Sequence, residues 1–219
     1  MAMNHLTLAD EIVVLMLDDR SGELREVFGG VTGVAIAGGL LMELALLGRI
    51  DTDLNALFVV DTTPTGDDLL DATLREIAAE PERHPSSWWV ARIGARRDEL
   101  LSAVLARLVE RGILREEQRR FLWVFERRAY PQVSGREERE AKGRLMALLF
   151  SDAVPEPRDT LLLGLAEVTG VLDGMLSTEE RRKVQDRIED VVALEEIGRS
   201  VGRVAEELQA ALAQAILPL

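Results

Sequence analysis

The sequence predicts a mainly α-helical fold, a single globular domain over residues 1–219 that surrounds a central apolar helix and carries small β elements. Three observations support this prediction. Apolar residues recur at helical spacing through most of the chain. The segment Val31–Leu47 is apolar almost all round, which is typical of a helix that is contacted on every side. Few runs have the β-branched or aromatic content of strands.

The expected helices can be placed in order along the chain. The first presents an apolar face from Leu8 to Met16, and Thr7 with Asp10 supplies its N-terminal cap. Pro64-Thr65-Gly66 interrupts the chain before a helix that opens at Asp67 or Asp68. Later helices are expected at Ile93–Val109, at Val184–Val192 behind a Ser177–Glu180 capping box, and at Ile197–Leu217.

Two short runs have strand character, Leu57–Val60 and Phe121–Phe125. Each follows a helical segment and a glycine turn, LLMELALLGRI at 40–50 and VLARLVERGIL at 104–114. Duplication and coincidence both explain this pseudo-repeat of helix, glycine turn and strand.

Composition excludes several classes of protein. The chain has 219 residues, a net charge of −13 and no cysteine, which removes disulfides, thiolate metal sites and cysteine nucleophiles. The longest uncharged apolar run, Gly33–Met42, is shorter than the ~20 residues of a membrane-spanning helix. The N-terminus lacks the basic segment of a signal peptide, so we expect a cytoplasmic protein. Abundant arginine beside very little lysine is typical of a GC-rich bacterial genome.

Motifs that suggest catalysis or metal binding are incomplete. Gly198–Gly202 matches G-x-S-x-G, but its flanks are helical and both histidines precede it. Asp51–Asn55 imitates the start of a calcium-binding loop, but Ala56 and Thr62 occupy the positions that need glycine and glutamate. The glycines within Gly29–Gly39 match neither dinucleotide-binding nor P-loop spacing. We therefore expect no enzyme, no metal and no cofactor.

Charge is distributed unevenly. Residues Arg92 to Arg144 carry a net charge of +5, while the remainder carries −18. In this basic middle segment, arginines flank the aromatic run near Phe121–Phe125. Two interpretations stand: a surface for an anionic bilayer, or a solvated helix face beside a hairpin packed into the core.

Four segments, in order, carry a family resemblance. They are HLTLADEIVVLMLDDRSGEL near the start, LLMELALLGRI at 40–50, PTGDDLLDATL at 64–74, and LVERGIL followed by FLWVFERRAYP at 108–131. Together they resemble the Golgi phosphoprotein 3 family, most clearly from Leu6 to about Pro131. The resemblance implies a largely helical fold with a projecting β-hairpin.

The resemblance also implies a function. Eukaryotic members are peripheral membrane proteins that bind phosphatidylinositol 4-phosphate and act as adaptors for retaining glycosyltransferases. We therefore expect a non-enzymatic, peripherally membrane-associated protein whose partner is an anionic membrane lipid, with a client protein and a homo-oligomer left open. No nucleic acid is expected as a partner.

The family's headgroup pocket falls on altered residues. Its tryptophan position falls on Phe28, and its three arginine positions fall on Ala37, Asp98 and Leu101. Nearby basic residues are candidates to replace the lost charges, namely Arg92, Arg96 and Arg97.

The family's membrane-contacting hairpin matches a second set of residues. These are Phe125, Arg127, Arg128 and Tyr130, which the resemblance places on or near the membrane-contacting loop.

Two alternative functions remain open. A helix, a glycine turn and a hairpin with basic residues also describe a DNA-binding winged helix. The third interpretation is a helical scaffold that self-associates through its hairpin.

Overall fold

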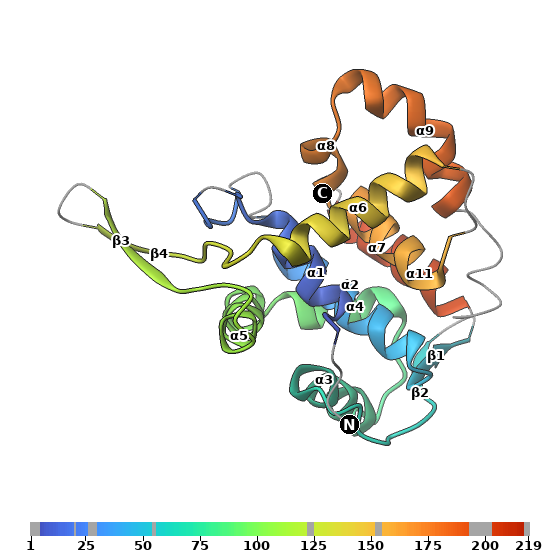
Figure 1. The fold of residues 1–219 in the computed structure, drawn as a ribbon. Coiled ribbons are helices and arrows are strands. Elements are labelled where there is room, and N and C mark those ends of the chain that lie inside the picture. The colour runs from blue at the N-terminus through green and yellow to red at the C-terminus, as the bar shows by residue number, and fades with distance from the viewer. Residues whose placement is uncertain are drawn as a thin grey trace.

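A computed structural model describes residues 5–19, 21–25, 30–53, 56–121, 125–151, 155–192 and 203–216. The helices are α1 (Leu8–Met16), α2 (Thr32–Leu46), α3 (Asp68–Ala79), α4 (Ser86–Gly94), α5 (Arg97–Glu110), α6 (Arg136–Phe150), α7 (Pro157–Val168), α8 (Val171–Met175), α9 (Thr178–Val192) and α11 (Arg203–Ile216). The strands are β1 (Ile50–Thr52), β2 (Leu57–Val59), β3 (Glu117–Phe121) and β4 (Phe125–Ala129). The predicted mainly α-helical fold is confirmed (Figure 1).

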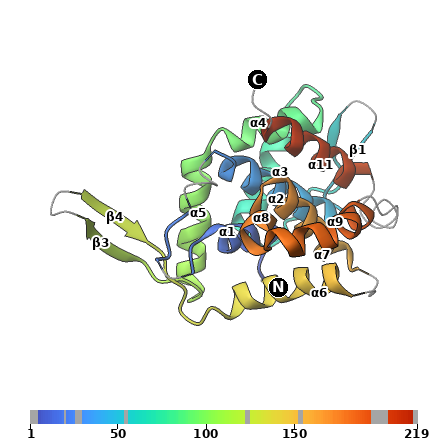
Figure 2. The same cartoon turned by 90° about the horizontal axis from the view of Figure 1, so that it is seen from above.

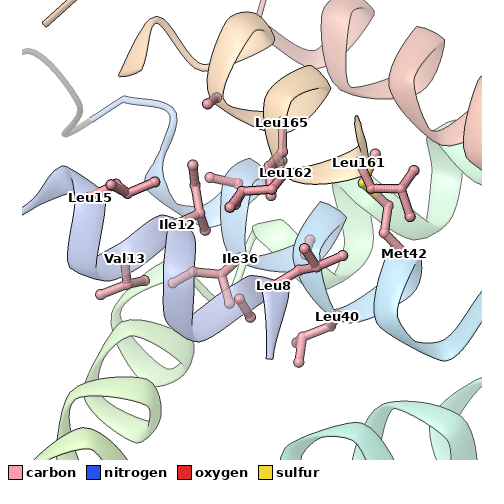
Figure 3. Packing of buried hydrophobic residues seen from close by; sticks show 14 of the residues in the cluster. Leu8, Ile12, Val13, Leu15, Ile36, Leu40, Met42, Leu161, Leu162 and Leu165 are labelled. Atoms are coloured by element: carbon pink, nitrogen blue, oxygen red, sulfur yellow. The ribbon is translucent and has the colours of Figure 1, made fainter. Parts of the chain in front are cut away.

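Helix α2 is the central apolar helix that the sequence predicts. Nearly all of its residues are buried, and it packs against α1, α4, α5, α7 and α11. Gly39 allows α1 to approach closely, because a Cβ atom at Gly39 would lie 2.7 Å from the backbone nitrogen of Ala9. Aliphatic side chains of α1, α2 and α7 fill the space between these helices (Figure 3). Among the described residues, no helix has both the length and the apolar character needed to cross a bilayer.

The predicted helix starts are confirmed by their caps. The Thr7 hydroxyl accepts a hydrogen bond from the Asp10 amide at 3.2 Å, and the Asp10 carboxylate accepts one from the Thr7 amide at 3.0 Å. Asp67 caps α3 by accepting hydrogen bonds from the amides of the next turn. Ser177 and Glu180 form the expected reciprocal pair before α9. The Gly198–Gly202 motif lies outside the described residues.

Two expected element boundaries are wrong. The segment Ile93–Val109 is not one helix, because α4 ends at Gly94 and Arg96 has non-helical backbone angles before α5. Gly94 lies directly against Gly33 of α2, so the chain turns where these two helices touch.

The aromatic run Phe121–Phe125 is not one strand either, since Phe121 ends β3 and Phe125 begins β4. The β3–β4 ladder is formed mainly by the polar residues that flank the aromatic run, within 117–120 and 126–128. Hydrophobic patterning misses such a ribbon, because strands with two polar faces lack the alternation that marks a half-buried strand.

Both halves of the pseudo-repeat fold as a helix, a left-handed glycine and a hairpin. Gly48 follows α2 with φ 64°, and Gly112 follows α5 with φ 70°. Each glycine amide donates to the carbonyl three residues earlier and the next amide donates to the carbonyl five residues earlier, all at 2.9 Å. This is the Schellman C-cap, in which glycine takes the left-handed conformation without steric cost.

The hairpins formed by β1–β2 and β3–β4 occupy different environments. Ile50, Thr52 and Leu57 of the first are buried in the body of the protein. The β3–β4 hairpin extends away from the helices in both views, on the side along which α5 runs (Figures 1 and 2). The segment 21–25 holds the root of this hairpin, because the Tyr130 amide donates to the Gly22 carbonyl at 2.8 Å.

Candidate functional site

Two sets of arginines from the basic middle segment and α7 differ in their surroundings. The first set, Arg107, Arg144 and Arg158, is called the core arginines below. Arg107 donates to Asp10 at 3.0 Å and to Asp67 at 2.7 Å, and the Asp10 side chain has 0% exposure. One guanidinium thereby joins α5 to α1 and to the N-cap of α3.

Arg158 and Arg144 make a second buried junction. Arg158 donates to both oxygens of Glu43 at 2.8 and 2.9 Å, and also contacts Glu11. Arg144 bridges Glu11 and Asp159. The pKa of Glu11 is raised above its usual value, chiefly by burial and also by the charge of Glu43, although Arg158 and Arg144 act to lower it.

Four acidic residues of this buried network belong to the segments that carry the family resemblance. Asp10 and Glu11 belong to the first quoted motif, Glu43 to the second and Asp67 to the third. Their carboxylates hold arginines between helices, so these residues serve the fold. Within the described residues, no cluster of three or more His, Asp or Glu side chains is arranged to hold a metal ion.

The second set, Arg92, Arg96 and Arg97, is called the rim arginines below. Arg92 Nε donates to Glu76 Oε1 at 2.9 Å, and Arg96 Nη2 donates to Glu76 Oε2 at 2.5 Å. The side chains of Arg92 and Arg96 are 45% and 40% exposed. The structure therefore brings these two predicted site residues together around one carboxylate of α3.

Aromatic rings hold Arg92 in place. Its guanidinium lies 4.8 Å from the centroid of the Trp88 ring, within cation–π range. Trp88 in turn stacks on His84 at 3.6 Å, and Glu80 lies 3.4 Å from the Arg92 guanidinium.

Arg97 lies beside the first turn of α2. A Cβ atom at Gly33 would lie 3.0 Å from the Arg97 Cβ, and Val31 provides no side-chain cap for α2. Arg97 pairs with Asp98 at 2.8 Å. Phe28, the predicted aromatic partner, lies outside the described residues.

The positions that correspond to the family's arginines do not provide cations. Ala37 is fully buried on α2, and Leu101 packs partly buried against the core. Asp98 is 89% exposed on its side chain and carries a negative charge. Any basic headgroup site on this part of the molecule therefore depends on the rim arginines.

The hairpin residues predicted to contact a membrane spread along β4. Phe125 pairs with Phe121 at the distal end of the ladder, Arg127 pairs with Arg119, and Arg128 pairs with Gln118. Arg127 and Arg128 thus lie two and three residues along β4 from the distal ladder pair of Phe121 and Phe125. Arg128 is 68% exposed and lies 3.4 Å from Glu116. Tyr130 lies at the root and packs against the core.

The rim arginines and the hairpin occupy opposite ends of α5. The helix begins at Arg97 and leads through Gly112 to β3. Its 14 residues span roughly 20 Å at the helical rise per residue. Helix α5 thus runs from the end of α4 to the base of the hairpin (Figure 2).

Sequence reasoning missed the acidic partners of the rim. Glu76 of α3 and Glu80, the C-cap of that helix, stand four residues apart, and Arg92 and Arg96 stand four residues apart across α4 and the turn after it. Matching spacings of opposite charge favour pairing between two neighbouring helices, but the sequence does not reveal that α3 and this segment are neighbours.

The winged-helix interpretation loses its support in α5, the helix before the projecting hairpin. Arg107 is held by Asp10 and Asp67, while Arg111 lies 3.7 Å from Asp10 and donates to the His5 carbonyl. These arginines face acidic partners in the body and do not form the exposed basic face that a DNA groove requires.

Two pockets also adjoin the C-terminal half of α5. One of 420 Å³ lies between the N-terminal segment and α6, and the other of 570 Å³ lies between α3 and α5. Both have charged residues of opposite sign on their walls, and Arg111 lines each of them.

Comparison with known proteins agrees with this architecture. The family model for Golgi phosphoprotein 3 (GPP34) matches residues 8–216. Vacuolar protein sorting-associated protein 74 of Schizosaccharomyces pombe (strain 972 / ATCC 24843) is 28% identical over 169 residues, which cover 68% of this chain and 50% of that relative. The chain thus spans about half the length of that curated relative. Because the family model covers nearly the whole chain, the protein belongs to the Golgi phosphoprotein 3 family.

Proposed function

We propose that this protein is a non-enzymatic, cytoplasmic peripheral membrane protein that binds anionic lipid headgroups. The hairpin contacts the bilayer through the region of Phe125, Arg127 and Arg128, and the rim arginines bind a headgroup with the help of Phe28. Phosphatidylinositol 4-phosphate is the headgroup that the family suggests. The continuous family match over residues 8–216 supports treating the chain as one domain.

The observation that carries the proposal is the projecting β3–β4 hairpin (Figure 1). A two-stranded hairpin is marginally stable alone in water. This one carries Arg119, Arg120, Arg127 and Arg128 around an aromatic centre. Basic residues near an anionic surface contribute about 1 kcal/mol each, and aromatic side chains favour the interface. We infer that a bilayer supplies contacts to this projecting hairpin.

An adaptor role is a second part of the proposal. The name of the fission yeast relative places that protein in vacuolar protein sorting. We infer that this chain likewise brings a client protein to the membrane. Self-association through the hairpin is an outcome that light scattering in the absence of lipid would reveal.

Vesicle co-sedimentation tests the membrane proposal. The variant Arg127→Glu/Arg128→Glu reverses two charges on the hairpin. The control, Arg182→Glu/Lys183→Glu, makes the same change in net charge at two exposed residues of α9. Helix α9 lies on the far side of the molecule from the hairpin in both views (Figures 1 and 2).

At low salt, wild type and the α9 variant should pellet with anionic vesicles, whereas the hairpin variant should lose at least about tenfold in affinity. Binding should weaken as salt rises, because exposed charges are screened. Equal binding by the hairpin and α9 variants, or no binding by wild type, would overturn the proposal.

A further inference from the structure

Glu76 occupies the place of an anionic ligand between two rim arginines. Arg92 and Arg96 each donate one hydrogen bond to a different oxygen of its carboxylate. Two guanidinium groups hold two oxygens of a phosphate in the same way. The carboxylate therefore fills the recognition geometry from within the protein.

The charges around this fork balance. The three rim arginines face three carboxylates, those of Glu76, Glu80 and Asp98. A singly charged headgroup that replaces Glu76 substitutes one monoanion for another and gains little. A phosphomonoester carries about −1.5 to −2 charges at pH 7 and three acceptor oxygens, so it gains both charge and hydrogen bonds.

Arg92 does not depend on Glu76 alone. Its guanidinium also contacts the Trp88 ring and Glu80. Arg97 is paired with Asp98, whose side chain is 89% exposed, and an exposed pair of this kind is weak. Arg97, the residue after Arg96, is thus a further weakly held cation.

We propose that Glu76 is an internal counter-ion that an incoming headgroup displaces, and that it makes the rim selective for phosphomonoester lipids over singly charged lipids. This inference rests on the proposed membrane function. It adds a residue that sets specificity and that limits binding to ordinary anionic bilayers.

Two isosteric neutralisations test the inference. Glu76→Gln removes the counter-ion, and Glu82→Gln makes the same change in net charge at an exposed residue between α3 and α4. Each protein is titrated with vesicles that contain phosphatidylinositol 4-phosphate and with vesicles that contain phosphatidylserine at equal nominal surface charge. A separate calorimetric titration uses soluble inositol 1,4-bisphosphate, which requires no membrane.

Wild type should prefer the phosphomonoester vesicles. Glu76→Gln should bind phosphatidylserine vesicles about fivefold more tightly, the effect of one unit charge near the surface, and should lose most of that preference. It should also bind the soluble headgroup more tightly than wild type, whereas Glu82→Gln should stay within about twofold of wild type throughout.

The outcomes separate this inference from the membrane proposal. If wild type binds vesicles but Glu76→Gln and Glu82→Gln behave alike, the counter-ion role is wrong and the membrane proposal stands. If no protein binds vesicles, the membrane proposal fails, and the soluble headgroup then decides. Tighter headgroup binding by Glu76→Gln supports the counter-ion role, and unchanged or absent binding overturns it.

Discussion

Arg97 and Arg107 stand at opposite ends of α5 and illustrate two uses of arginine. Arg107 holds two carboxylates, one of them fully buried, and its side chain is 17% exposed. Arg97 is 39% exposed and pairs with a carboxylate that faces solvent. The core arginine joins three helices, whereas the rim arginine leaves charge at the surface that a ligand can use.

The comparison shows what the family motifs encode. Asp10, Glu43 and Asp67 hold core arginines, so the quoted motifs specify how the helices are joined. The rim lies largely outside those motifs, with Glu76 just beyond the third of them. The residues of the rim can therefore change while the buried junctions of the fold are kept.

The same substitution at both ends of α5 should give the largest difference. Arg107→Met leaves Asp10 buried without its cation and should lower the free energy of unfolding by about 3–5 kcal/mol. Arg97→Met removes an exposed pair and should cost less than about 1 kcal/mol. Chemical denaturation of the two variants measures the contrast, and similar losses would break the distinction between core and rim.

The contact between α2 and α4 should give an intermediate effect. A methyl group at Gly33 would lie 2.2 Å from the Gly94 carbonyl oxygen, so Gly33→Ala should cost about 1–3 kcal/mol by forcing the helices apart beside Arg97. The control is Gly143→Ala on the exposed face of α6, where nothing lies within 4 Å. That control should stabilise the protein by about 0.5–1 kcal/mol through helix propensity. A neutral Gly33→Ala would show that the rim is not built on this close contact.

The pH dependence of Glu11 should give the smallest effect. Its pKa in the folded protein is raised by burial, so the unfolded chain loses this proton at lower pH than the folded chain does. Wild type should therefore lose stability relative to Glu11→Gln as pH rises above about 4.5 and through the raised pKa. Urea denaturation of both proteins from pH 4 to 7 measures the difference. If the free energy of unfolding of wild type minus that of Glu11→Gln stays constant or increases as pH rises, the assigned cause is contradicted.

Local signals in the sequence predicted much of the fold. Thr7, Asp67 and Ser177 mark helix starts because capping depends on residues within one turn. The apolar circumference of α2 predicted a central helix for a similar reason. The break before Arg97 and the true limits of the hairpin were missed, because the first depends on contact with Gly33 and the second on pairing between polar strands.

The candidate site was only partly predictable. Charge distribution selected Arg92, Arg96 and Arg97, and the structure clusters the first two. The charge distribution could not reveal Glu76, whose role depends on how α3 packs beside the end of α4. Tyr130 was selected for its aromatic ring, yet it anchors the hairpin root.

Contact between the hairpin and the bilayer is the central claim, and a site-specific label tests it most directly. The chain has no cysteine, so a single introduced thiol can be labelled without background. An environment-sensitive fluorophore at Phe125→Cys should shift to the blue and brighten with anionic vesicles, while the same label at Asp186→Cys on α9 should not respond. An aqueous spectrum at position 125, recorded while the protein sediments with the vesicles, would contradict the claim.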